Sequence, residues 1–163
     1  MMSSVPHGPS HNQPNWLELN RCVRFGDTDA AGVMHFHQLM RWCHEAWEES
    51  LQRYGVAAAD VFPGGRGSEG EPMIALPVIH CEADFLKPVH GGDELIVKLE
   101  PERLDPGRFE LRSTFLLKQP ETIVARGLIR HLAIDIASKR RCHLPESVDR
   151  WLEASGLGQL REL

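Results

Sequence analysis

Residues 38–54 carry the pattern that most limits what this chain can fold into. Apolar and small side chains recur there at spacings of three and four, at Leu39, Cys43, Ala46, Trp47, Ser50 and Tyr54. This spacing puts them on one face of a helix, with charged side chains mostly elsewhere, and Gly55 follows as a C-terminal cap. The pattern predicts a helix from about Gln38 to Tyr54. Because its apolar face is rich in large side chains, we expect it to be the central helix of the domain.

The remainder of the chain is mainly β in character. Alternation of apolar and polar residues predicts a strand over residues 16–25, before the helix. From Met73 onward the chain is β in character, and turn residues separate the strands expected over 74–86, 94–104, 109–119 and 121–136. The clearest turn is Asp105-Pro106-Gly107, since proline fixes φ and glycine permits a positive φ. A short final helix is expected over residues 145–154. Together these elements predict an α+β domain in which a five-stranded antiparallel sheet wraps one long helix.

The length of 163 residues suits a single domain. Residues 1–15 are rich in Ser, Pro, His and Asn, which predicts a disordered leader. We expect the folded domain to span residues 16–155 and a short tail to span 156–163. Residues 62–72 hold four glycines and two prolines, which predicts a flexible loop of the kind that often borders a site.

Charge and composition exclude several classes of function. A net charge of -5 argues against nucleic-acid binding, which needs a dense face of Lys and Arg. No segment approaches the roughly 20 apolar residues of a membrane span, and the N-terminus lacks the order of a signal peptide. The four cysteines are far apart and form no CxxC pair. We therefore expect a cytoplasmic protein with free thiols that binds neither nucleic acid nor membrane.

The loop from Gly26 to Gly32 is the best candidate for chemistry. It places Asp27 and Asp29 immediately before the start of the predicted helix. Backbone N–H groups at a helix N-terminus are unpaired and carry partial positive charge, so they can stabilise an oxyanion. A carboxylate and an oxyanion site within one loop are what ester or thioester hydrolysis requires.

Other interpretations of these residues remain open or are disfavoured by their spacing. In one alternative, the aspartates of this loop act as helix caps and have no catalytic role. A calcium loop is rejected, because Ala31 and Gln38 stand where an EF-hand needs ligands. His35, His37 and His44 form no recognised zinc motif, and no Gly-x-Ser-x-Gly nucleophile is present. A nucleophilic role for Cys43 is disfavoured, because its place on the apolar helix face indicates an inert core thiol.

The ten residues from Arg24 to Val33, RFGDTDAAGV, resemble the signature of the 4-hydroxybenzoyl-CoA thioesterase family of hotdog proteins. That signature has an aromatic or apolar residue, then x-Asp-x-Asp-x-x-Gly and Val or Ile, at the first strand-to-helix junction. The resemblance covers about residues 16–154. Residues 43–49, 84–88 and 127–131 resemble in particular a cyanobacterial subgroup that hydrolyses 1,4-dihydroxy-2-naphthoyl-CoA in phylloquinone biosynthesis.

The resemblance implies roles for individual residues. The second aspartate of the signature is catalytic in the family, as nucleophile or general base, and corresponds to Asp29. Asp27 is then a structural partner that braces the turn. The oxyanion donor is implied to be the backbone N–H of Phe36, seven positions after Asp29. Another branch of the family has a histidine at this position, and neither His35 nor His37 is assumed to take its role.

The resemblance further implies an acyl-CoA thioester hydrolase that needs no metal or other cofactor, coenzyme A being part of the substrate. The acyl group stays open between 1,4-dihydroxy-2-naphthoyl, benzoyl and fatty acyl, carried by coenzyme A or by an acyl carrier protein. A non-catalytic acyl-CoA-binding module is the remaining alternative. A homodimer or homotetramer is expected, with sheets joined edge to edge and the acyl pocket between subunits. Weak candidates for contacts to the coenzyme A phosphates are Lys87, Lys139, Arg140 and Arg141.

Overall fold

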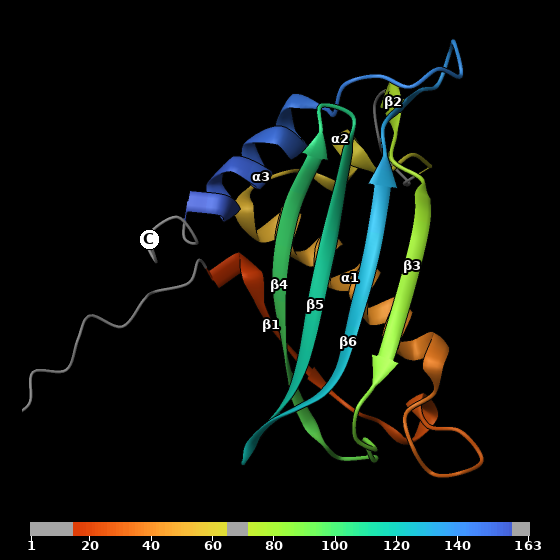
Figure 1. Cartoon of the computed structure of the whole chain (residues 1–163), viewed down its shortest axis with the longest axis vertical. Helices are drawn as coiled ribbons and strands as arrows, with labels where there is room; N and C mark the ends of the chain where they lie inside the picture. Colours follow the sequence, from red (N-terminus) through yellow and green to blue (C-terminus); the bar gives the residue numbers. More distant parts are fainter. Residues whose placement is uncertain (1–14, 65–71, 158–163) are drawn as a thin grey trace, which may run out of the picture.

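The structure, a computed structural model, describes residues 15–64 and 72–157. Its main element is a five-stranded antiparallel sheet in the order β1-β4-β5-β6-β3 (Figure 1). The strands are β1 (Glu18–Cys22), β3 (Val78–Phe85), β4 (Glu94–Asp105), β5 (Arg108–Lys118) and β6 (Glu121–Leu132). The helix α1 (Phe36–Tyr54) crosses one face of this sheet. The predicted α+β architecture, one long helix against five antiparallel strands, is confirmed.

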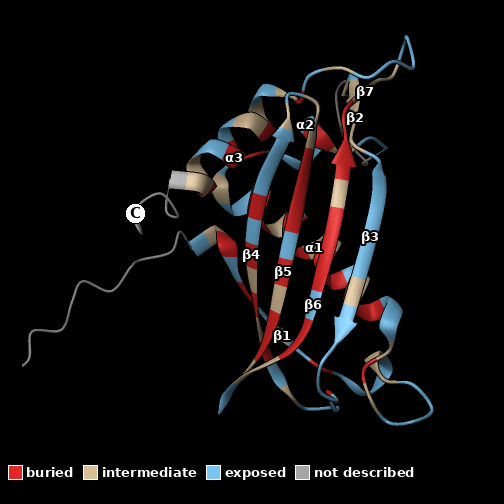
Figure 2. Ribbon diagram, in the orientation of Figure 1, coloured by how far each residue is buried: buried red, intermediate tan, exposed pale blue. Residues whose placement is uncertain are grey.

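The core lies between α1 and the sheet, as the buried stripe along both shows (Figure 2). Alternate residues of β4, β5 and β6 point toward the helix, so that inward-facing pairs such as Leu111 with Ile129 and Phe115 with Ala125 lie side by side. The helix contributes the buried residues Gln38, Leu39, Trp42, Cys43, Ala46, Trp47, Ser50 and Leu51. The period of 3.6 on the helix and of 2 on the strands thus meets at one apolar layer.

The ends of α1 are fixed by caps. Gly55 adopts the left-handed conformation with φ of 112°, and its N–H donates to the Leu51 and Gln52 carbonyls. At the start, the side chain of His35 accepts a hydrogen bond from the N–H of His37. The helix therefore begins at Phe36, two residues before the predicted start. Histidine is not a usual N-cap residue, so this start was difficult to predict from residue types alone.

α1 packs closely on the sheet at Gly127 of β6. A Cβ atom at this position would overlap the Sγ atom of Cys43, which is buried against it. Only a residue without a side chain fits, so Gly127 sets how near the helix can lie. Burial raises the pKa of the Cys43 thiol to about 11. A thiol in this environment stays protonated, in agreement with the interpretation of Cys43 as an inert core residue.

Three predicted strands are shorter or broken in the structure. The predicted strand over residues 16–25 is reduced to β1, between the short 3-10 turns Asn15–Leu17 and Phe25–Asp27. The predicted strand over 74–86 is divided into β2 (Ile74–Ala75) and β3 around Pro77, which has no N–H for a ladder. The predicted strand over 121–136 is divided into β6 and β7 (Ile134–Asp135). Strands β2 and β7 pair with each other in a separate small sheet.

Two further helices complete the structure. The short α2 (Ala58–Val61) was not predicted. The last helix, α3 (Glu146–Leu157), was predicted, and the indole N–H of its Trp151 donates to Ser50 Oγ on α1 at 3.1 Å. The predicted leader (residues 1–15, of which the structure describes Asn15) and the tail end (158–163) lie outside the described residues, as does most of the predicted loop 62–72. The proposed domain boundaries therefore stay predictions.

Candidate active site

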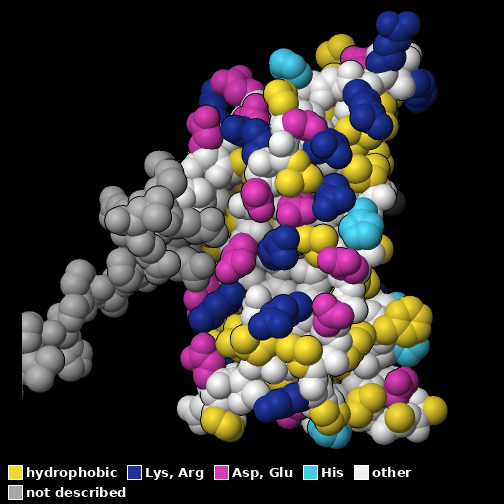
Figure 3. All heavy atoms as spheres, viewed as in Figure 1, with side chains coloured by type: hydrophobic (Ala, Val, Ile, Leu, Met, Phe, Trp, Pro, Cys, Tyr) yellow, Lys and Arg dark blue, Asp and Glu magenta, His cyan; other side chains and the backbone are white. Residues whose placement is uncertain are grey.

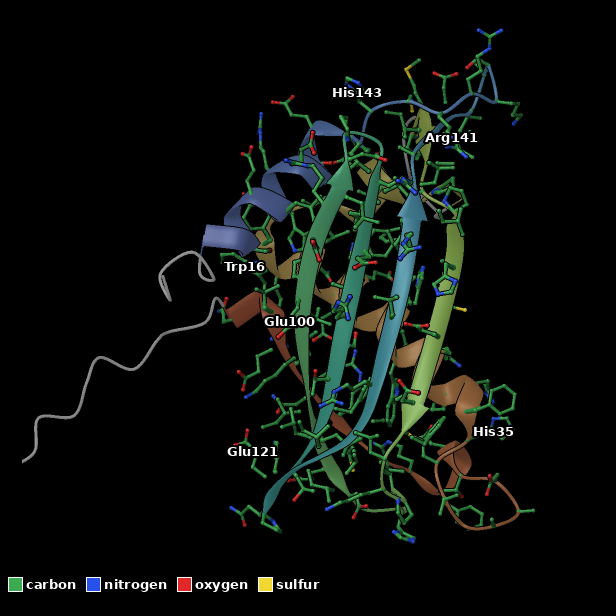
Figure 4. The ribbon with its side chains drawn as sticks, in the orientation of Figure 1. Trp16, His35, Glu100, Glu121, Arg141 and His143 are labelled. Atoms are coloured by element: carbon green, nitrogen blue, oxygen red, sulfur yellow. The ribbon has the colours of Figure 1, made fainter. Side chains whose placement is uncertain are left out.

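The loop that joins β1 to α1 is held at both ends by the turn that follows β3. The N–H of Val23 donates to the Asp93 carbonyl at 2.8 Å, and the N–H of Met34 donates to the Val89 carbonyl at 2.8 Å. Within the loop, Thr28 and Met34 form an isolated β-bridge. Residues 24–33 thus form a compact loop at one end of the sheet, beside the start of α1 (Figure 4, where His35 is labelled).

Asp27 stabilises this loop. One of its carboxylate oxygens accepts a hydrogen bond from the Arg24 N–H at 2.8 Å, and its carbonyl accepts one from the His35 N–H at 2.8 Å. These two contacts connect the end of the strand to the start of the helix. The half-buried Asp27 side chain therefore has a structural role, as a hydrogen-bond acceptor for the backbone.

Asp29 lies at the tip and its side chain is exposed. Its Oδ1 accepts a hydrogen bond from the Ala31 N–H at 2.8 Å, and its own N–H donates to the Val33 carbonyl at 2.9 Å. Gly32 closes the turn with φ of 78°, a conformation that favours glycine. Oδ2 has no hydrogen-bond partner among the described residues. The carboxylate is thus oriented through one oxygen while the other is available to a substrate or to water.

The N-terminus of α1 offers an N–H donor in the same region. The N–H groups of His37 and Gln38 donate to the side chain and carbonyl of His35. The N–H of Phe36, the first residue of the helix, has no acceptor within residues 15–64 and 72–157. Such a free donor at the positive end of a helix suits a developing negative charge.

The surface around this junction is apolar. The side chains of Phe25 and Phe36 are 92% and 67% exposed, and those of Phe85 and Leu86, at the end of β3, are about half exposed. Figure 3 shows hydrophobic side chains gathered with histidines at this end of β3. Large exposed apolar groups beside a carboxylate indicate a surface that is covered by a substrate or by another protein chain.

A second feature, which sequence reasoning missed, is an apolar cavity of about 450 Å³. It lies where the middle of α1 faces α2 and the small sheet of β2 and β7, and Pro77 at the strand break forms part of its wall. It is lined by His44, Trp47, Val61, Phe62, Pro63, Ala75, Leu76, Pro77, Ile134, Ile136 and Lys139. Segments that are separate in the sequence form it. The one signal in the sequence was the predicted loop 62–72, whose first residues, Phe62 and Pro63, line the cavity.

Behind this cavity lies a buried histidine. His131 of β6 is stacked on Phe109, with ring centroids 4.9 Å apart, and packs on Trp47 at 4.3 Å. Its Nδ1 lies 2.9 Å from the Leu76 carbonyl oxygen, which can only accept, so Nδ1 carries the proton. Its Nε2 is buried without a partner among the described residues. Burial lowers the pKa of His131 from 6.5 to about 4, so the ring is neutral at neutral pH.

Because the pKa of His131 is lowered in the folded state, we expect the protein to lose stability in mild acid. Below pH 6.5 the unfolded chain binds a proton at this residue, whereas the folded chain does not until about pH 4. The stability present above pH 6.5 should therefore fall with pH, by about 3 kcal/mol near pH 4. Urea unfolding between pH 7.5 and 4 should show a shallower decline for His131→Phe than for the wild type. Equal declines would contradict this, and exposed His143→Phe is the matched control.

The basic residues considered for coenzyme A contacts are not brought together. Lys87 follows the end of β3, near the Asp29 loop, whereas Lys139 lines the cavity. Arg140 and Arg141 are exposed beside Lys139, at the opposite end of the molecule from His35 (Figure 4, where Arg141 is labelled). Within one chain, Lys87 is therefore distant from the other three basic residues.

The described residues contain no group of three or more His, Cys, Asp or Glu side chains that could hold a metal ion. In particular, His35 and His37 contact each other through their Nδ1 atoms, while His44 lies beside Trp47 and Phe62. The four cysteines are free. Among the described helices, none is long and apolar enough to cross a membrane.

Comparison with known proteins identifies the family. The model of the thioesterase-like superfamily matches residues 23–152. The chain is 66% identical over 149 residues to the 1,4-dihydroxy-2-naphthoyl-CoA hydrolase of Parasynechococcus marenigrum (strain WH8102), covering 91% of this chain and 97% of that protein. It is 60% identical to the protein of the same name from Prochlorococcus marinus (strain MIT 9303), with the same coverage of 91% and 97%.

Solved structures agree with this. A crystal structure of a Prochlorococcus marinus protein (strain MIT 9313) superposes with a TM-score of 0.85 at 61% identity, over 89% of this chain and 99% of that one. A 1,4-dihydroxy-2-naphthoyl-CoA thioesterase from Synechocystis superposes with a TM-score of 0.75 at 29% identity, over 83% and 94%. The predicted hotdog fold is confirmed, and the chain belongs to the thioesterase-like superfamily of acyl-CoA hydrolases.

Proposed function

We propose that this chain hydrolyses 1,4-dihydroxy-2-naphthoyl-CoA to 1,4-dihydroxy-2-naphthoate and coenzyme A, the step that phylloquinone biosynthesis requires. The observation that carries the proposal is the junction of Asp29 with the N-terminus of α1, in a chain up to 66% identical to hydrolases of that name. The high coverage of both sequences supports transfer of the substrate as well as of the fold.

Asp29 is proposed as the catalytic carboxylate. In one route its free oxygen attacks the thioester carbon, the C–S bond breaks, coenzyme A leaves as thiolate, and water cleaves the resulting anhydride. In the other route the carboxylate takes a proton from the attacking water. A single turnover in ¹⁸O-labelled water tests the first route. Only in that route can the new oxygen of the product come from the Asp29 carboxylate, which leaves the product without ¹⁸O.

The Phe36 N–H is proposed as an oxyanion donor. In either route the thioester oxygen gains negative charge as the carbonyl carbon becomes tetrahedral. The unpaired Phe36 N–H at the start of α1 can stabilise that charge, and one such donor contributes about 10²–10³ in rate. The chemistry described needs no metal or redox cofactor, so we propose that none takes part. The four free thiols suit the reducing cytoplasm proposed as its location.

A homodimer, or a tetramer built from two such dimers, is proposed as the active form. β3 is an edge strand whose only neighbour among the described strands is β6. It is exposed almost throughout (Figure 2), and it exposes apolar Val78 and Ile79 at one end and Phe85 at the other. A long exposed edge with apolar side chains favours pairing with another strand. Pairing of β3 with its copy would join two sheets into one.

Substitution at this edge tests the dimer. Ile79→Lys is expected to weaken dimerisation about tenfold or more, because it places a charge in an apolar contact, and to lower activity with it. Analytical ultracentrifugation over a range of concentrations measures this. Leu104→Lys is the matched control, since Leu104 is also an exposed apolar residue but lies on β4. An unchanged dissociation constant for Ile79→Lys would contradict pairing through β3.

The reaction itself is tested by product analysis. The purified chain is expected to convert 1,4-dihydroxy-2-naphthoyl-CoA into equal amounts of free coenzyme A and 1,4-dihydroxy-2-naphthoate, with and without EDTA. Chromatography with thiol titration measures both products. Tight binding of the thioester without release of coenzyme A would instead favour a non-catalytic acyl-CoA-binding module.

A further inference from the structure

His35 connects the loop that carries the candidate carboxylate to the helix that carries the candidate oxyanion donor. Its backbone N–H donates to the Asp27 carbonyl at 2.8 Å, and its own carbonyl accepts from the Gln38 N–H at 3.1 Å. The next residue, Phe36, begins α1 and has the free N–H. In Figure 4 the labelled His35 lies at the end of α1 beside the loop. A change at His35 should therefore alter the geometry of the first helical turn.

The half-buried side chain of His35 caps α1 in place of the short side chains that usually do so. Its Nδ1 accepts a hydrogen bond from the His37 N–H at 3.2 Å, a bond for which Ser, Thr, Asp and Asn are preferred. The imidazole supplies more than an acceptor, because its ring also packs on its neighbours. Its centroid lies 4.6 Å from that of the Phe36 ring and 4.2 Å from that of His37. His35 thus contacts the residue on each side of the Phe36 N–H as well as Phe36 itself.

The capping hydrogen bond determines where the protons of this histidine pair lie. A backbone N–H can only donate, so Nδ1 of His35 carries no proton and the single ring proton is on Nε2. Nδ1 of His37 contacts the same atom and must be the donor in that contact. The ring of His35 is therefore neutral. It caps the helix without placing a negative charge at the start of α1, as an aspartate would.

A neutral cap matters because the free donor has to attract negative charge. His35 accepts the N–H groups of the second and third helical residues, which leaves that of Phe36 free for an oxyanion. A carboxylate at the same place would satisfy these groups equally well. Its charge, however, would lie beside the oxygen that becomes negative in the reaction and would oppose that charge.

We infer that His35 is a positioning residue for thioester hydrolysis: its neutral ring fixes the direction of the Phe36 N–H without adding negative charge beside the oxyanion. This rests on the proposed function and adds to it the residue that sets the geometry of the donor. His35 acts through Phe36 and not on the thioester itself. Its effect should therefore appear in kcat rather than in KM, because the oxyanion develops only as the reaction proceeds.

Three substitutions of His35 separate positioning from capping alone. His35→Ala removes the acceptor and the ring, and should lower kcat about 10- to 100-fold while KM changes less than about twofold. His35→Asn keeps a neutral acceptor and should hold kcat within about fivefold of the wild type. His35→Asp caps the helix as well as asparagine does, so both should have similar melting temperatures. Its charge should nevertheless keep kcat at least about tenfold below that of His35→Asn.

Two measurements on each purified variant give this comparison. Thermal unfolding followed by circular dichroism reports the stability that the cap provides, and steady-state release of free coenzyme A gives kcat and KM. The substrate is the acyl-CoA that the wild type hydrolyses fastest. A preference for another acyl group would therefore contradict the naphthoyl substrate and leave this test intact. His143→Asp is the matched control, because it adds the same charge at an exposed histidine at the opposite end of the molecule (Figure 4).

The comparison of asparagine with aspartate decides the result. Equal kcat values for His35→Asn and His35→Asp would overturn the inference, because they would show that the residue serves only as a cap. Wild-type kcat in a folded His35→Ala variant, or a change confined to KM, would overturn it as well. If His35→Ala does not fold, the other two variants still test the inference, since each keeps an acceptor for the His37 N–H.

Discussion

Asp29→Asn is expected to lower kcat by about 10²–10⁴-fold with little change in KM, because an amide neither attacks a thioester nor accepts a proton from water. The substitution is isosteric, and the amide oxygen can still accept the hydrogen bond from the Ala31 N–H. The loop should therefore keep its conformation. Steady-state release of free coenzyme A from 1,4-dihydroxy-2-naphthoyl-CoA measures the effect.

Two controls make this result specific. Glu102→Gln removes one exposed carboxylate from β4, distant from the loop, and should leave kcat unchanged. Asp27→Ala removes the acceptor for the Arg24 N–H and should lower the melting temperature as well as activity. Wild-type turnover by Asp29→Asn would show that another group performs the reaction.

Gly127→Ala is expected to destabilise the fold by about 3 kcal/mol, because overpacking at a rigid contact forces backbone shifts. The new methyl group would overlap Cys43 Sγ between the helix and the sheet. Urea unfolding measures the free energy of unfolding. Gly91→Ala is the control, since nothing lies within 4 Å of a Cβ atom at that position, and it should change stability by less than about 0.5 kcal/mol.

Cys43→Ala should rescue Gly127→Ala in part. It removes the overlapping sulfur atom, while the remaining Cβ atom of residue 43 is 3.9 Å from the added methyl, an ordinary contact. The double variant should be more stable than the sum of the single effects predicts, by about 1–3 kcal/mol. Strict additivity would contradict the contact between these two residues.

The fold was predictable where local patterns decide it. The long helix follows from side chains at spacings of three and four, and the hairpin at Asp105-Pro106-Gly107 follows from turn chemistry, with the Gly107 N–H bonded to the Asp105 side chain. The division of two strands was not predicted. The break within 74–86 falls at Pro77, which has no N–H for a ladder. The break within 121–136 depends on Ala133, whose N–H donates to the Gly107 carbonyl. Such a choice between distant partners leaves no periodic signal in the sequence.

The candidate site divides in the same way. Asp29 and Phe36 belong to one continuous segment, so a signature of ten residues and the helix start are enough to suggest them. The cavity around His44 needs α1, α2 and the small sheet to meet. Spacing along the chain carries little information on that contact. The histidine at position 131 was noted in the sequence only as part of a resemblance, because its burial is set by Phe109 and Trp47.

The most direct test is a comparison of kcat/KM for 1,4-dihydroxy-2-naphthoyl-CoA, benzoyl-CoA and palmitoyl-CoA with the purified wild-type chain. The proposed function predicts that the naphthoyl thioester is preferred at least about 100-fold, a ratio that differential contacts in a shaped pocket can supply. A preference for palmitoyl-CoA would keep the thioesterase and contradict the naphthoyl substrate. Absence of coenzyme A release from all three would contradict hydrolysis itself.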